Sequence, residues 1–154
     1  MNKIEHKDEI VRHESAGGFI FYESPKDGTL YVALVQKPNG AFYVPKGQLK
    51  NYETPERAAL REIKEELTLS RIPKLVGKIG ISDYSFHLPG DERPHYKIVH
   101  LFVYMINKVK IHPEKKENFI DAKWFTFDEA INIIAFDREY LIEAKNLYVQ
   151  KRNG

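Results

Sequence analysis

One stretch of the chain carries a full set of helix signals, and it limits how the rest can be arranged. Thr54 can cap a helix, Pro55 follows at the first helical position, and Glu56 suits the positive end of the helix dipole. Further along, apolar residues recur at four-residue spacing: Ala59, Ile63 and Leu67. Such a stripe predicts an amphipathic helix that packs against other elements through that one face.

Short strand-like runs occupy much of the remaining chain: residues 16–22, 30–36, 41–44, 75–81, 98–106 and 122–127. Asp27-Gly28 separates the first two runs, and this dipeptide favours a tight turn between strands. Asn39-Gly40 predicts a second turn, and Pro45-Lys46-Gly47 is expected to break the run that follows it. Strands with few helices among them predict an α/β fold, in which a mixed β-sheet packs between helices.

The ends of the chain and one internal segment have other patterns. Residues 128–134 and 138–150 predict two further helices. Residues 85–96 are rich in charge, histidine and proline, so we expect a loop there. Residues 1–13 are polar and mixed in charge, and we expect them to form a loosely held arm.

The composition narrows the class of protein. The 154 residues suit one domain, which we assign to residues 1–154. The absence of cysteine excludes disulfides, thiolate catalysis and thiolate zinc sites. A net charge of +2 gives no sign of a membrane or a stable nucleic-acid partner. The N-terminal residues lack the apolar run of a secretory signal, so we expect a cytoplasmic protein.

Three glutamates share one side of the predicted helix, because positions three and four apart lie on the same face: Glu62, Glu65 and Glu66. Like charges so close together repel one another, and a hard divalent cation with oxygen ligands relieves that repulsion. Acidic runs are also common on solvated helix faces, so the cluster alone leaves both interpretations open. Glu53 and Arg61 can form a bidentate pair that fixes the preceding loop against the helix.

The spacing of these residues resembles the Nudix box, G-x5-E-x7-R-E-U-x-E-E-x-G-U, in which U is a bulky aliphatic residue. In the box at residues 47–69, the matching positions are Gly47, Glu53, Arg61, Glu62, Ile63, Glu65, Glu66 and Leu69. The departure is Thr68, where the pattern has glycine. Glycine is favoured there for its left-handed conformation, so the departure concerns the turn that ends the helix and removes no ligand.

Three segments outside the box also resemble the Nudix hydrolases, a MutT-like family: residues 16–18, 44–47 and 122–125. The resemblance covers residues 15–148. It implies an α/β/α sandwich with a mixed sheet, and hydrolysis of a nucleoside diphosphate that is linked to another group.

The resemblance also implies a catalytic site that depends on Mg²⁺, with Mn²⁺ as a substitute. Glu62, Glu65 and Glu66 would hold the metal, and one of them would orient or deprotonate the attacking water. Arg61 and Glu53 would act as supports of this site rather than as reactants.

Other residues could complete the site. A backbone carbonyl near Lys46 or Gly47 could face the cation, and the Lys46 side chain could either meet a phosphate or remain solvated. In many relatives another acid precedes the Trp-bearing strand and completes the metal shell. Glu114 and Glu117 are the candidates for that role, and the alternative is that both are exposed loop residues.

Two segments after the box, residues 79–84 and 95–97, are similar to those of asymmetrical diadenosine tetraphosphate hydrolases. This resemblance implies that Tyr84 stacks on adenine and that His95 and Lys97 hold phosphate oxygens. The alternative is a core aromatic at Tyr84 and a solvated lysine at Lys97, because stacking and packing use the same residue types.

Three functions are consistent with these sequence features. The first is Mg²⁺-dependent, asymmetric hydrolysis of diadenosine tetraphosphate to ATP and AMP. The second is a Nudix pyrophosphohydrolase that acts on nucleoside triphosphates, ADP-ribose or 5′-triphosphate ends of RNA. The third is a catalytically inactive nucleotide-sensing module, whose usual signs are a lost box carboxylate or an appended DNA-binding domain. The sequence shows neither sign.

Overall fold

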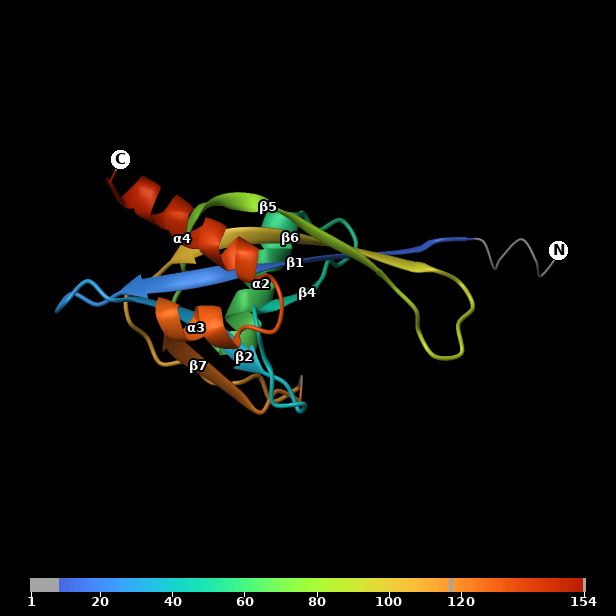
Figure 1. Cartoon of the computed structure of the whole chain (residues 1–154), viewed down its shortest axis with the longest axis horizontal. Helices are drawn as coiled ribbons and strands as arrows, with labels where there is room; N and C mark the ends of the chain where they lie inside the picture. Colours follow the sequence, from blue (N-terminus) through green and yellow to red (C-terminus); the bar gives the residue numbers. More distant parts are fainter. Residues whose placement is uncertain (1–8, 117, 154) are drawn as a thin grey trace.

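The computed structural model describes residues 9–116 and 118–153. The strands are β1 (Val11–Glu23), β2 (Leu30–Gln36), β3 (Phe42–Tyr43), β4 (Lys46–Gln48), β5 (Lys74–Phe86), β6 (His95–Met105) and β7 (Asp121–Thr126). The helices are α2 (Pro55–Leu67), α3 (Phe127–Ile133) and α4 (Arg138–Asn153) (Figure 1). Each predicted strand run and each predicted helix therefore has a counterpart in the fold.

The strands form a mixed sheet in the order β3-β2-β1-β6-β5, with β4 paired to β1 and β7 paired to β2. β1 and β6 are parallel, and the other pairs are antiparallel. One edge of β1 changes partner along its length, because Phe21 to Glu23 pair with β2 and Ser15 to Gly17 pair with β4. The sheet forks where the partner changes. The run at residues 41–44 does break, since β3 ends at Tyr43, but Lys46 and Gly47 then belong to a new strand, β4.

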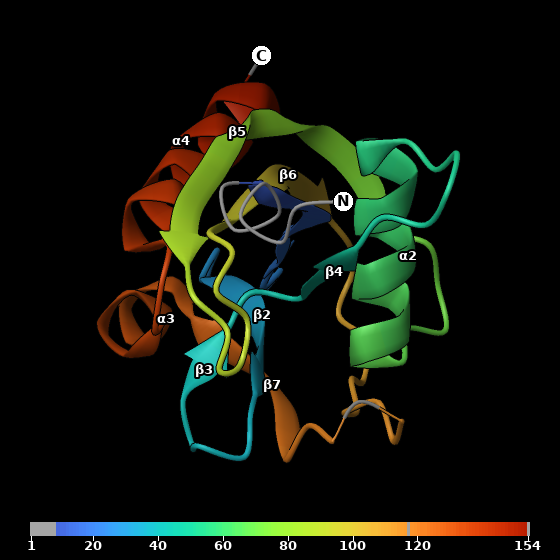
Figure 2. The same ribbon diagram turned by 90° about the vertical axis from the view of Figure 1, so that its right-hand side faces the viewer.

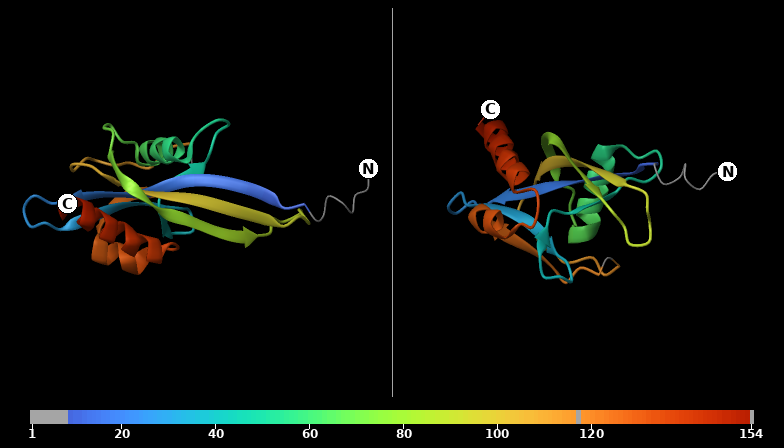
Figure 3. Two further views of the ribbon diagram at one scale, coloured as in Figure 1. Left: turned by 90° about the horizontal axis from the view of Figure 1, so that it is seen from above. Right: turned by 45° about the vertical axis from the view of Figure 1, so that its right-hand side comes forward.

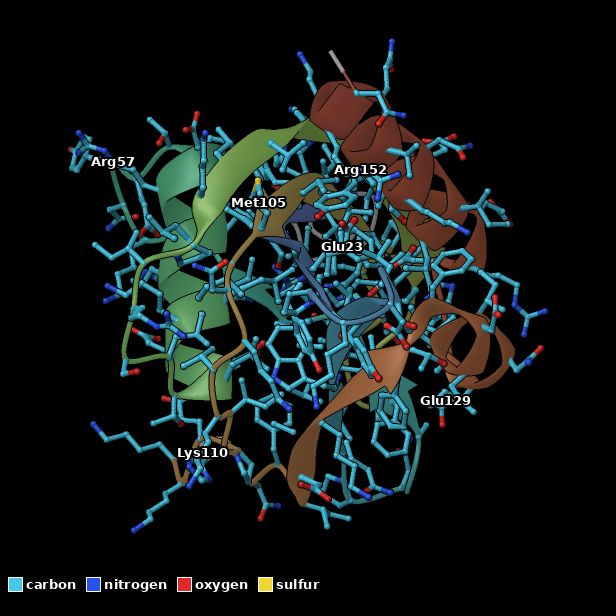
Figure 4. The ribbon with its side chains drawn as sticks, turned by 90° about the vertical axis from the view of Figure 1, so that its left-hand side faces the viewer. Glu23, Arg57, Met105, Lys110, Glu129 and Arg152 are labelled. Carbon is cyan, nitrogen blue, oxygen red and sulfur yellow. The ribbon has the colours of Figure 1, made fainter. Side chains whose placement is uncertain are left out.

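Helices cover both faces of the sheet, with α2 on one side and α3 and α4 on the other (Figure 2). Side chains alternate along β1, so Phe19 and Phe21 enter the core beneath α3 and α4 while Ile20 enters the core beneath α2. Arg152 near the end of α4 pairs with Glu23 at the end of β1 (Figure 4). These layers confirm the expected sandwich.

Beyond the helices, β1, β5 and β6 continue as a long ribbon that projects from the body (Figures 1 and 3). Two sequence predictions were wrong here. The expected loop at residues 85–96 is shorter, because Phe86 pairs with His95 across the β5–β6 hairpin. The expected N-terminal arm ends earlier, because Val11 pairs with His95 in the parallel register. Backbone pairing outweighs the polar composition in both segments. Residues 1–8 lie outside the described part of the chain.

Helix α2 begins and ends as its sequence signals predict. The Thr54 side chain accepts a hydrogen bond from the backbone N–H of Arg57, and Pro55 occupies the first turn. At the other end Thr68 takes the left-handed conformation, with φ 52° and ψ 49°. A β-branched residue is strained there, but the Thr68 hydroxyl donates to the carbonyl of His112 at 2.9 Å. Threonine thus replaces the usual glycine without changing how the helix ends.

Candidate active site

The three box carboxylates differ in exposure although they leave the same helix. Glu62 and Glu66 are buried, with 9% and 4% of their surfaces exposed. The side chain of Glu65 is 45% exposed. Two carboxylates therefore lie between α2 and the sheet, and the third lies at the surface beside them.

Arg61 ties the loop before α2 to the helix. Its Nε and Nη2 atoms donate to the two carboxylate oxygens of Glu53, each at 2.8 Å, and this is the predicted bidentate pair. Nη2 also donates to the carbonyl of Gln48 at 3.0 Å, and the backbone N–H of Lys50 donates to Glu53 at 2.9 Å. The hydrogen bond from Arg61 is the main cause that lowers the pKa of Glu53 to about 2. This pair holds the loop that runs from β4 to α2.

The Glu53–Arg61 pair makes stability depend on pH in acid. The folded protein holds the Glu53 pKa at about 2, against 4.5 for the free group, so the unfolded chain takes up a proton first as the pH falls. The contribution is complete above pH 4.5 and is lost toward pH 2. We expect Glu53→Gln to cost about 1 kcal/mol near pH 6.5 and to lose less further stability in acid than the wild type. Urea unfolding at pH 6.5 and pH 3 measures both values; equal acid losses in the two proteins would contradict the role of the pair.

The three carboxylates predicted to bind a metal already have ion-pair or hydrogen-bond partners within the protein. Arg61 Nη1 lies 2.7 Å from Glu62 Oε1 and 3.5 Å from Glu65 Oε2. The backbone N–H of Lys46 donates to Glu66 Oε2 at 2.8 Å. Among residues 9–116 and 118–153, no three acidic or imidazole groups stand together as a metal-binding cluster. A divalent cation would therefore compete with the Arg61 guanidinium for Glu62 and Glu65.

At Gly47 the backbone of β4 lies very close to the Glu62 carboxylate. A Cβ atom at Gly47 would lie 2.2 Å from the carboxylate carbon of Glu62 and 2.4 Å from both of its oxygens. Only glycine lets the β4 backbone approach this carboxylate so closely. Carboxylate and backbone oxygens are the ligands that Mg²⁺ prefers, so the residues present fit a hard divalent cation.

Two adjoining cavities open beside the fork in the sheet. The larger, of about 530 Å³, is lined by Lys37, Tyr43, Lys46, Ser82, Asp83, Tyr84, Lys97, Phe136, Asp137, Glu139 and Tyr140. The smaller, of about 310 Å³, is lined by Val35, Lys37, Pro38, Val44, Lys46, Glu66, Lys97, Asn118 and Phe119. Lys37, Lys46 and Lys97 line both cavities, so they connect the box carboxylate Glu66 with the aromatic residues of the larger cavity.

The three lysines make the shared wall electropositive. Burial lowers the pKa of Lys46 most, Lys37 lowers it further, and the charges of Asp137 and Glu66 oppose both effects. Burial also lowers the pKa of Lys97, and Lys46 and Lys37 lower it further. Like charges held this closely destabilise one another, and a polyanion bound between them would relieve the repulsion.

The structure brings together most of the predicted substrate residues but not His95. Lys46, Tyr84 and Lys97 line the larger cavity, and Tyr84 is 44% exposed, which excludes its reading as a core aromatic. His95 shares a face of β6 with Lys97 but lies two residues further along the projecting ribbon. It is 2% exposed there, with its Nε2 atom 2.9 Å from Asp91 Oδ2. Phe86 packs against its ring, so His95 is enclosed by the ribbon and does not reach the cavity.

The two further acids proposed from the sequence are Glu114 and Glu117. Glu114 is half-buried in the loop before β7 and is not among the described residues that line either cavity. Glu117 lies outside the described residues.

Sequence reasoning missed the other residues of the larger cavity: Lys37, Tyr43, Ser82, Asp83, Phe136, Asp137, Glu139 and Tyr140. Lys37 lies in the β2–β3 turn, Tyr43 in β3, and Ser82 and Asp83 in β5. The remaining residues lie at the start of α4 or just before it, far from the box in the chain. Phe136 could have been recognised from the sequence. It is a large aromatic residue next to an acid, in the short segment between two predicted helices, where no apolar helix face would bury it. It is 65% exposed in the structure.

A model of the NUDIX domain family matches residues 11–144, so the chain belongs to the Nudix family. Hydrolases of this family act on phosphoanhydride bonds and generally use divalent metals such as Mg²⁺. The box at residues 47–69, with its carboxylates on α2, lies within the matched range.

Solved structures with similar folds come from several Nudix proteins. A C. elegans Ap4A hydrolase binary complex is 19% identical with a TM-score of 0.64, covering 90% of this chain and 98% of that one. The NUDIX domain of Shewanella oneidensis NrtR, complexed with ADP ribose, is 17% identical with a TM-score of 0.66, covering 97% and 99%. The E. coli dihydroneopterin triphosphate pyrophosphohydrolase is 17% identical with a TM-score of 0.66, covering 86% and 96%. At these identities the likeness establishes the fold.

A search of curated protein sequences found no match. Within the described part of the chain, no helix has the length and apolar character needed to span a bilayer.

Proposed function

We propose that the protein is a Mg²⁺-dependent hydrolase that cleaves diadenosine tetraphosphate asymmetrically into ATP and AMP. The observation that carries the proposal is the row of lysines that joins Glu66 to an aromatic cavity. A linear polyphosphate with a nucleoside at its end matches this order of groups: base in the aromatic cavity, phosphates along the lysines, and the scissile bond near α2. We expect it to act on this small nucleotide in the cytoplasm.

Each group has a part in this scheme. Lys37, Lys46 and Lys97 would bind phosphate oxygens and hold the chain in line. Tyr84 and Phe136 offer exposed rings on which a base can stack. Bound Mg²⁺ would neutralise charge on the phosphates and lower the pKa of a coordinated water.

The α2 carboxylates would hold the cation. Glu62 and Glu66 would bind from their buried positions, and Glu65 from the surface. Arg61 would keep Glu53 and the β4–α2 loop in place through the bidentate pair, and would release Glu62 and Glu65 to the metal.

The second candidate is hydrolysis of another nucleoside diphosphate derivative. The similar fold of the NUDIX domain complexed with ADP ribose supports this possibility for the larger cavity, which has aromatic and cationic walls as well. Nucleoside triphosphates and 5′-triphosphate ends of RNA would also place phosphates on the lysines. An inactive nucleotide-sensing module is the third possibility, and the complete set of box carboxylates argues against it.

Product analysis tests these alternatives. Purified protein is incubated with Mg²⁺ and diadenosine tetraphosphate, and the products are resolved by anion-exchange chromatography, with Glu65→Gln in parallel. ATP and AMP in equal amounts, reduced in the variant, would support the proposal. Two molecules of ADP would contradict asymmetric cleavage. Turnover of ADP-ribose or a triphosphate, but not of diadenosine tetraphosphate, would favour the second candidate. Binding of these nucleotides with no turnover of any would favour the sensing module.

A further inference from the structure

Asp137 stands at the head of α4 but does not cap the helix with its side chain. Its carbonyl accepts the first helical hydrogen bond, from the backbone N–H of Leu141 at 2.9 Å, which defines it as the N-cap position. An aspartate there usually accepts a backbone N–H of the first turn with its carboxylate. Among the described residues, the only hydrogen bond to this carboxylate comes from the Ser82 hydroxyl, at 3.2 Å.

The backbone explains the unusual direction of this side chain. Asp137 has a φ of 68°, in the left-handed region that non-glycine residues rarely adopt, whereas capping residues have extended backbone. The backbone of Asp137 is therefore strained, and its side chain makes no capping hydrogen bond to the first turn of α4. Its side chain lines the larger cavity instead. Strained backbone and missing local hydrogen bonds are common at residues that bind a ligand.

The larger cavity combines cationic, aromatic and acidic side chains. Lys37, Lys46 and Lys97 line it together with Phe136, Tyr84, Tyr140 and Asp137. Burial, and after it the charge of Asp137, raises the pKa of Tyr84 and of Tyr140, which agrees with a carboxylate close to both phenols. A nucleotide offers partners for each kind of side chain, because it has phosphates for the lysines and an aromatic base with N–H donors for the rings and the carboxylate.

We propose that Asp137 selects the nucleobase, by accepting a hydrogen bond from the exocyclic amine of adenine. This inference rests on the proposed function and names the base that the cavity takes. An ionised carboxylate is only an acceptor, so one that faces position 6 attracts the amino group of adenine and repels the oxo group of hypoxanthine. It would reach the N1–H of hypoxanthine only if that base shifted in the cavity. Ser82 fixes the carboxylate through Oδ1, and the other oxygen can face the base.

An alternative role for Asp137, as a counter-charge, would change the nucleotide affinities in a different way. Its charge raises the pKa of Lys46, so it could serve only as a counter-charge that tunes phosphate affinity. In that case the loss of the carboxylate would strengthen binding of every nucleotide by the same factor, whatever its base. Base selection, in contrast, changes the ratio between two nucleotides that differ only in the base.

The test is equilibrium binding of ATP and ITP by isothermal titration calorimetry in EDTA, where turnover does not interfere. The two nucleotides differ at position 6, as an amine or a carbonyl. We expect the wild type to prefer ATP by about tenfold or more, as for a hydrogen bond to a charged group. Asp137→Asn should bring the two affinities within about threefold, because an amide can turn to donate as well as accept.

Two further variants complete the design. Glu139→Gln removes the same charge from the same cavity wall and should keep the preference for ATP. Ser82→Ala removes the group that fixes Asp137 and should weaken the preference without a change of charge, which also serves as the test if Asp137→Asn fails to fold.

Equal binding of ATP and ITP by the wild type would overturn base selection but leave the proposed hydrolysis intact. An equal gain in affinity for both nucleotides in Asp137→Asn would also overturn it, in favour of the counter-charge. Failure of the wild type to bind either nucleotide without a metal would also overturn this inference, whereas the Mg²⁺-dependent hydrolysis is decided by the product analysis.

Discussion

Glu66→Gln is expected to lower kcat for the proposed hydrolysis by about 10³-fold, since a metal ligand contributes several kcal/mol of charge stabilisation. Glu66 is the box carboxylate that lines the cavity shared with the three lysines. The neutral amide keeps the size of the side chain and can still accept the hydrogen bond from the backbone N–H of Lys46. The variant therefore loses the charge proposed to bind the cation but keeps the contact between α2 and β4.

The matched control is Glu56→Gln, the same chemical change in the first turn of the same helix. Glu56 is exposed and is not among the residues that line either cavity. Its kcat should stay within about twofold of the wild type. Rates are measured over a range of Mg²⁺ concentrations, with circular dichroism to confirm folding. A Glu66→Gln enzyme with near-normal kcat would exclude Glu66 as a metal ligand.

The fold was predictable where its signals are local. The cap at Thr54, the proline after it and the apolar stripe fix α2 within a few residues of sequence, and the structure agrees. The strand pairings were not predictable in the same way. β4 forms because Gly17 lets Lys46 approach β1, and Phe86 is a strand residue because β6 pairs with it. Such pairings depend on residues that are distant in the chain.

The site, like the fold, was predictable from the sequence only in part. The Glu53–Arg61 pair follows from the spacing of the box, and the structure contains it. The far half of the cavity does not follow, because Phe136 and Asp137 reach it from the loop before α4, about half the chain away. His95 illustrates the opposite case. Its type and position beside Lys97 suggested a phosphate contact, and only the pairing of β5 with β6 shows that Phe86 covers it.

Gly17 is the residue on which the approach of β4 to β1 depends. A Cβ atom there would lie 2.1 Å from the carbonyl oxygen of Pro45 and 2.6 Å from Cα of Lys46. These are backbone atoms, so no rotation of a side chain can remove the overlap. The same stretch donates to Glu66 and carries Lys46 into the cavity. The position therefore couples the stability of the sheet to the geometry of the site.

We expect Gly17→Ala to lower the free energy of unfolding by about 3 kcal/mol, the upper part of the range for overpacking, because β4 has to move away from β1. Activity of the folded fraction should fall as well, since Lys46 moves with β4. The control is Gly77→Ala, whose Cβ would lie 3.1 Å from the end of the flexible Leu147 side chain and should cost less than about 1 kcal/mol. Urea unfolding of both variants gives the comparison. Equal losses would mean that β4 does not lie as close to β1 as the pairing of Gly17 with Lys46 requires, and the lysine wall of the cavity would then have to be placed differently.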